Sequence, residues 1–105
     1  MLDNKAVIEK VVDYRFIEII KKLEEVCVRD NRKNAIDLYP MTYLESVLDW
    51  DLLNLMGRNE AVLYNIETDI VKNRFKYLAE NMYKNVDVYF RSDDSVEITY
   101  YREAK

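Results

Sequence analysis

The chain has 105 residues and a formal net charge of −4, and it contains no histidine, one cysteine, one glycine and one proline. The absence of histidine removes the usual proton shuttle and the commonest zinc ligand, and a single glycine argues against a glycine-rich phosphate loop. The acidic balance disfavours non-specific attraction to nucleic acid or to an anionic membrane. With 50% hydrophobic residues, we expect one domain, residues 1–105.

Nothing in the sequence predicts export or insertion into a membrane. No stretch resembles a signal peptide, and no run of apolar residues approaches the length of a membrane span. Cys27 lies between two valines and is expected to be a buried thiol. We therefore expect a cytoplasmic protein. Frequent Asn, Lys, Ile and Tyr are typical of AT-rich genomes, which include those of many phages and other mobile elements.

The clearest predicted element is a helix over residues 5–29. Its apolar side chains recur with a helical period and form one stripe: Ile8, Val12, Phe16, Ile19, Leu23 and Val26. A second apolar set lies among charged residues on the opposite side: Val7, Tyr14, Ile17 and Val28. This set predicts a second contact, made by later elements of the chain, by another copy in a homodimer, or by a different partner.

A short strand and a second helix are predicted next. The alternating segment 35–39 is a possible short strand that joins a sheet. Thr42 and Glu45 have the spacing of a capping box, which predicts a helix over 43–56. Gly57 is the only glycine and is expected to end that helix as a left-handed C-cap.

Asp51 lies in an apolar stripe of this second helix, where an ionised carboxylate is costly. We expect it to be paired with an arginine or a tyrosine hydroxyl; the alternatives, in order, are a position at the exposed rim of the core and a functional role. A third helix is predicted over residues 60–83, although its apolar stripe changes side near Thr68. The segment 62–66 also fits a strand.

The C-terminal part changes from a helical period to an alternating one, which predicts an antiparallel hairpin of strands 86–90 and 96–101. Facing residues must lie on the same side of a sheet, so the expected pairs are Phe90 with Val96, Val88 with Ile98, and Val86 with Tyr100. The predicted fold class is therefore α+β, with three main helices followed by a hairpin.

The remaining carboxylates do not form an evident catalytic or metal site. Asp49 and Asp51 point in different directions on a helix, and Asp93 and Asp94 lie in a hairpin loop, where aspartate is common. A nuclease-like pattern would need a lysine two residues after Glu97, and that position is a threonine. We expect no enzyme activity, no cofactor and no metal.

Acidic and tyrosine side chains gather on the hairpin, which favours a protein-binding module. The residues expected to contact the partner are Asp87, Tyr89, Asp93, Asp94, Glu97 and Tyr101. Such a surface suits a basic host protein, for example a nuclease or another nucleic-acid-binding effector. The concrete hypothesis is a phage or mobile-element inhibitor of a host defence protein, of the anti-CRISPR or anti-restriction type.

A second hypothesis comes from the order of the elements, which resembles that of a winged-helix domain. This resemblance implies that residues 60–76 enter a DNA groove and that the hairpin acts as the wing. The expected DNA contacts are then Arg32, Lys33, Lys72 and Arg74. The acidic hairpin loop repels phosphate, so direct binding of nucleic acid is the less favoured hypothesis.

Overall fold

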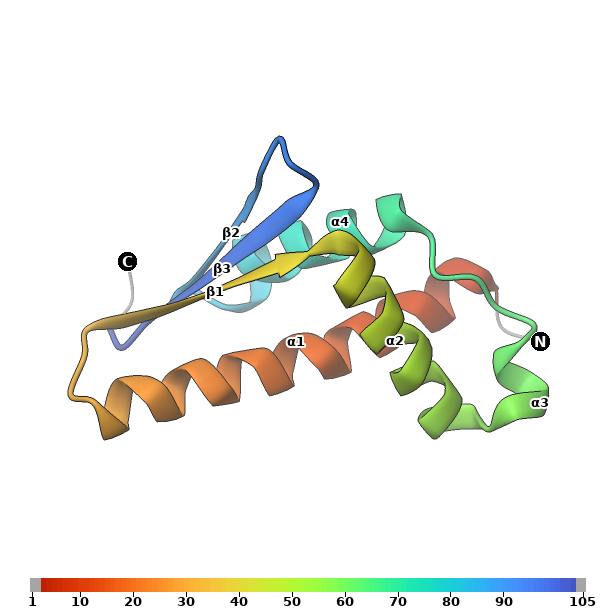
Figure 1. Cartoon of the computed structure of the whole chain (residues 1–105), viewed down its shortest axis with the longest axis horizontal. Coiled ribbons are helices and arrows are strands. Elements are labelled where there is room, and N and C mark those ends of the chain that lie inside the picture. Colours follow the sequence, from red (N-terminus) through yellow and green to blue (C-terminus); the bar gives the residue numbers. More distant parts are fainter. Residues whose placement is uncertain (1–2, 104–105) are drawn as a thin grey trace.

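A computed structural model describes residues 3–103 (Figure 1). The order of elements confirms the predicted α+β class: several helices, an extra strand and a C-terminal hairpin. The elements are α1 (Asn4–Arg29), β1 (Asn34–Pro40), α2 (Met41–Met56), α3 (Arg58–Ala61), α4 (Thr68–Tyr77), the π-helical turn η1 (Leu78–Met82), β2 (Val86–Phe90) and β3 (Ser95–Tyr101). No helix within the described residues is long and apolar enough to span a membrane.

The long helix α1 runs along the length of the molecule, on one side of the sheet (Figure 1). Asp3 caps its N-terminus, and the Asp3 carboxylate accepts a hydrogen bond of 2.8 Å from the backbone N–H of Ala6. The predicted stripe packs into the core, where Phe16 contacts Phe75 of α4 with a ring separation of 5.3 Å. Cys27 is buried, as predicted.

The second apolar set on α1 is covered only in part by the rest of the chain. Val7 is buried within the chain's own core. Tyr14, Ile17 and Val28 remain exposed. Contacts within the chain therefore account for only part of the predicted second face.

The three strands form one antiparallel sheet in the order β1-β3-β2. The predicted hairpin register is confirmed: Phe90 faces Val96, Val88 faces Ile98, and Val86 faces Tyr100. The predicted short strand 35–39 is also confirmed, as the middle of β1, and it pairs with β3. One face of the sheet supplies the core with buried residues, among them Ala35, Val86, Val96, Ile98 and Tyr100.

The predicted continuous helix over 60–83 is wrong, because the chain leaves the helical path between α3 and α4. Hydrogen bonds from α1 hold this segment in an irregular path. The Asn4 side chain accepts from the backbone N–H of Asn65 at 2.8 Å and donates to the Asn65 carbonyl at 3.1 Å. Because this side chain satisfies both backbone groups of Asn65, the loop needs no helical partner there. The alternative strand over 62–66 is wrong as well.

The predicted capping box is also wrong. The helix α2 begins directly after Pro40, and its first N–H, on Met41, donates to the carbonyl of Asp94 in the hairpin loop at 2.9 Å. Glu45 instead accepts a hydrogen bond from the hydroxyl of Thr68, which joins α2 to α4. A tertiary contact therefore takes the place of the local cap. Gly57 ends α2 with a positive φ of +80°, as expected, but its ψ of 164° lies outside the left-handed helical region.

Asp51 has a partner of the predicted kind, which is Arg15 of α1. The guanidinium donates two hydrogen bonds to this carboxylate, of 2.7 Å from Nε and 2.6 Å from Nη2. Only 4% of Asp51 is exposed, so the pair satisfies a carboxylate that burial would otherwise penalise. The hydrogen bond to Asp51 raises the pKa of Arg15, and the pair fixes α1 against α2.

Candidate protein-binding face

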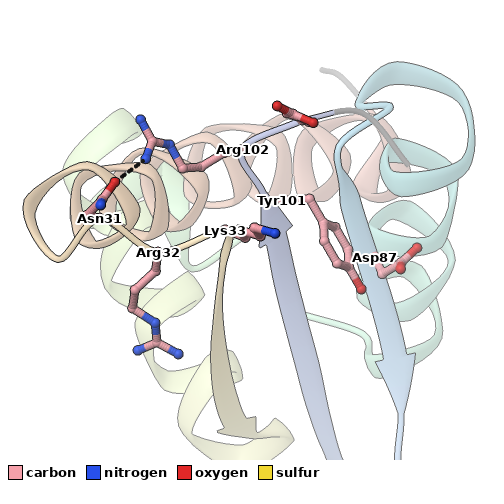
Figure 2. Close-up of a pocket in the computed structure, with 7 residues that line it drawn as sticks. Asn31, Arg32, Lys33, Asp87, Tyr101 and Arg102 are labelled. Carbon is pink, nitrogen blue, oxygen red and sulfur yellow. Dashed lines mark hydrogen bonds between the residues drawn. The ribbon is translucent and has the colours of Figure 1, made fainter.

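The outer face of the sheet is the side opposite the core. In Figure 2 the helices lie behind and beside the strands, and Asp87 and Tyr101 project from the near face. Strand pairing places outward-pointing residues in rows across this face. One row contains Leu38, Glu97 and Tyr89, and the next contains Ile36, Thr99 and Asp87. We call these six residues, together with Tyr101, the outer face.

Three large apolar side chains on the outer face are exposed to solvent. The exposed fractions are 53% for Ile36, 50% for Leu38 and 63% for Tyr89. These side chains come from both edge strands and flank the polar side chains of β3. A sheet face that presents apolar and tyrosine side chains between carboxylates has the composition of a protein interface.

The structure brings together four of the residues predicted to bind a partner: Asp87, Tyr89, Glu97 and Tyr101 all lie on the outer face. Sequence reasoning missed Ile36 and Leu38 as site residues. The available signal was the alternation around Asp37, which predicted a strand but left open which of its sides would be covered.

The other two predicted residues, Asp93 and Asp94, lie at the hairpin tip and differ in their contacts. Asp93 accepts a hydrogen bond from the Ser95 hydroxyl and lies 3.5 Å from the Arg91 guanidinium. The hydrogen bond from Ser95 lowers the pKa of Asp93. Asp94 has φ +60° and lies 3.7 Å from the ammonium group of Lys72 on α4. Asp94 is thus directed toward the helical side of the sheet.

Arg91 links the hairpin tip to the outer face. Its guanidinium donates a hydrogen bond of 3.1 Å to Glu97, in addition to its contact with Asp93. Both Arg91 and Glu97 remain partly exposed, so solvent weakens this attraction. The tip keeps a net negative charge, because Asp93, Asp94 and Glu97 outnumber Arg91 and Lys72.

A cavity of about 1010 Å³ lies at the opposite end of the outer face. Asp87 and Tyr101 line it from the strands, and three cations line it from the neighbouring turns: Arg32, Lys33 and Arg102 (Figure 2). The outer face is therefore electrically polarised, with acidic side chains around the tip and basic ones at the far end.

The four residues predicted to contact DNA do not form one surface. Arg32 and Lys33 precede β1, whereas Lys72 contacts Asp94 at the other end of the sheet. Arg74 donates two hydrogen bonds to Asp13 of α1, of 2.7 Å and 2.8 Å, and stacks on Tyr77. These interactions use the Arg74 charge within the fold, and the Asp13 hydrogen bonds raise the pKa of Arg74.

Comparison with known proteins gives no family to which the chain can be assigned, since no family model, curated protein or solved structure matches it. Within residues 3–103, no three carboxylate or thiol side chains are grouped so that they could hold a metal ion. The geometry of the outer face and of its two ends is therefore the basis for a functional proposal.

Proposed function

We propose that this chain is a non-enzymatic regulatory module that binds another protein through the outer face of its sheet. The observation that carries the proposal is the group of exposed side chains Ile36, Leu38 and Tyr89 on one sheet face. Apolar side chains in such a group gain free energy when a partner removes them from water.

The charge of the face indicates the kind of partner. Glu97 lies between Leu38 and Tyr89, and Asp93 and Asp94 lie at the adjacent tip. The whole chain carries a charge of −4, so its field attracts a positively charged protein surface. Proteins that handle nucleic acids carry such surfaces. Binding there would mask the surface that the nucleic acid needs.

The specific form of this proposal is an inhibitor encoded by a phage or another mobile element, directed at a host nuclease or nucleic-acid-binding defence protein in the cytoplasm. Composition supports this form, because the chain is small, acidic and rich in residues that AT-rich codons specify. Tyr89 supplies a large rigid contact with a hydroxyl group, which is common at energetically important interface positions.

Affinity capture tests this proposal when the bait is compared with matched variants. The organism's lysate is treated with nuclease and passed over the wild-type chain, a Leu38→Lys variant and a Val62→Lys variant. Val62 is 74% exposed and lies outside the outer face, so it provides the same change of charge elsewhere. We expect a basic protein to be retained by the wild type and by Val62→Lys, and lost with Leu38→Lys. Equal capture by all three baits would contradict the proposal.

DNA binding is the second candidate, because the sheet order and the order of elements fit a winged-helix arrangement. In that arrangement α4 would face the groove, and its exposed positions are Asp69, Asn73, Lys76 and Tyr77. Lys76 is the only cation among these four. A gel shift that appears at low salt and is lost in a Lys76→Glu variant would support this candidate. No shift on any duplex at low salt would remove it.

A further inference from the structure

The cavity at the basic end of the outer face is lined by side chains of both charges. Arg32, Lys33 and Arg102 provide the cations, and Asp87 and Glu103 provide carboxylates. Its volume of about 1010 Å³ is at the upper end of the range for small-molecule sites, which is roughly 300–1,000 Å³. The space is therefore large enough for a metabolite.

The end of α1 places two of these cations. Asn31 has φ +51°, and the N–H of Arg32 donates to the carbonyl of Cys27 at 2.9 Å. The N–H of Asn31 donates to the carbonyl of Val28 at 3.4 Å, which completes the two-bond pattern of a Schellman motif. This motif reverses the chain sharply, so that Arg32 and Lys33 follow immediately at the cavity wall.

The third cation comes from the segment after β3. The backbone N–H of Arg102 donates to the carbonyl of Lys33 at 2.9 Å, which holds the two segments side by side. The guanidinium of Arg102 donates to the side-chain oxygen of Asn31 at 3.3 Å (Figure 2). Backbone hydrogen bonds thus bring Arg102 beside Arg32 and Lys33, which are distant from it in sequence, and Figure 2 shows the three side chains extending from the cavity wall in different directions.

Within the described residues, these three charges take no part in ion pairs. Across residues 3–103, no carboxylate lies within 4.0 Å of the charged groups of Arg32, Lys33 or Arg102, although seven other cations have such a partner: Arg15, Lys21, Lys22, Arg29, Lys72, Arg74 and Arg91. The carbonyls of Val26, Cys27 and Val28 at the end of α1 already accept backbone hydrogen bonds. Capping the helix therefore does not require these side chains.

We infer that this cavity binds a phosphate dianion, either free or as the monoester group of a small metabolite. A dianion gains more than a monoanion from cations that line one cavity, and a forked guanidinium group, such as that of Arg32 or that of Arg102, matches the geometry of phosphate oxygens. The ring of Tyr101 and the carboxylates of Asp87 and Glu103 line the rest of the space.

This inference does not depend on the proposed protein partner, because the probes are small anions. The experiment is an NMR titration of the full chain with inorganic phosphate, adenosine monophosphate or acetate, at constant ionic strength. We expect saturable shifts of the amide signals of Arg32, Lys33 and Arg102 with both phosphates and a much weaker response to acetate. Tighter binding of adenosine monophosphate than of phosphate would identify a monoester ligand, and equal binding would identify the free ion.

A matched pair of variants separates a built site from general attraction. Lys33→Glu reverses a charge at the cavity, and Lys10→Glu reverses one on the exposed surface of α1. We expect Lys33→Glu to weaken phosphate binding about tenfold or more and Lys10→Glu to leave it unchanged. Amide signals must show that both variants are folded. Unsaturable shifts, or equal weakening in the two variants, would identify an adventitious ion only and overturn the inference.

Discussion

The two faces of the sheet are built from the same strands but have opposite environments. On the inner face, Val96 and Ile98 are fully buried against the helices. On the outer face, Ile36 and Leu38 are about half exposed, at 53% and 50%. A strand turns alternate side chains to opposite faces, so neighbouring residues of one strand can serve different purposes. The inner face stabilises the fold, and the exposed outer face is available for recognition.

The two faces also use arginine–carboxylate pairs differently. Arg15 and Asp51 form a pair on the helical side, where Asp51 is almost inaccessible to solvent. Arg91 and Glu97 form a pair at the edge of the outer face, where both side chains reach water. Breaking the first pair leaves a buried charge, whereas breaking the second leaves a charge that water can solvate.

The largest expected difference concerns isoleucines on the two faces. Ile98→Ala should lower the free energy of unfolding by about 2–5 kcal/mol, because it leaves a cavity in the core. Ile36→Ala removes the same atoms from an exposed position and should change the free energy of unfolding by less than about 0.5 kcal/mol. Urea unfolding of the two variants measures both values. Similar losses in the two variants would show that the outer face is covered in solution.

The ion pairs provide the next test. Arg15→Met should lower the free energy of unfolding by about 3 kcal/mol, since the Asp51 carboxylate would stay buried without its partner. Arg91→Met should cost less than about 1 kcal/mol. The double variant Arg15→Met with Asp51→Leu should recover most of the loss, and chemical denaturation of the four proteins, wild type included, measures this. No recovery in the double variant would mean that the cost comes from lost packing instead of an unpaired charge.

A smaller effect is expected at Tyr39 on the inner side of β1. Burial, followed by the 2.7 Å hydrogen bond to Asp37, raises the pKa of the Tyr39 hydroxyl above its usual value of about 10. The neutral Tyr39 hydroxyl should contribute about 1 kcal/mol to the free energy of unfolding. This contribution should be complete below pH 10 and decline as the pH rises further. Urea unfolding of wild type and Tyr39→Phe at pH 8, 10 and 11 tests this. If the stability advantage of the wild type over Tyr39→Phe grew with pH, the raised pKa of the Tyr39 hydroxyl would be contradicted.

The fold followed from the sequence wherever a local pattern decided it. Alternation in the hairpin favoured the pairing of Phe90 with Val96 over its pairing with Glu97, because a slip by one residue would put the apolar residues of the two strands on opposite sides. The chemistry of a buried carboxylate was sufficient to predict that Asp51 pairs with an arginine or a tyrosine hydroxyl, and the partner is Arg15. Both predictions depend on rules that hold wherever the elements are placed.

The incorrect predictions arose where distant residues overrode local preference. The apolar stripe changes side near Thr68, where α4 begins, but the hydrogen bonds that hold the loop at Asn65 come from Asn4, which lies outside the segment 60–83. Likewise, Glu45 contacts Thr68 instead of capping its own helix. The outer face could be predicted only in part, because the pairing of β1 with β3 adds Ile36 and Leu38 to the hairpin residues.

The central claim is that the outer face binds a protein partner, and two exposed tyrosines allow the most direct measurement. Tyr89 lies on the outer face and Tyr14 lies on α1, with exposed fractions of 63% and 48%. Once a partner is captured, calorimetry gives its affinity for the wild type, Tyr89→Ala and Tyr14→Ala. We predict about tenfold or greater weakening for Tyr89→Ala and no change for Tyr14→Ala. Unchanged affinity with Tyr89→Ala, or equal weakening in both variants, would contradict the account.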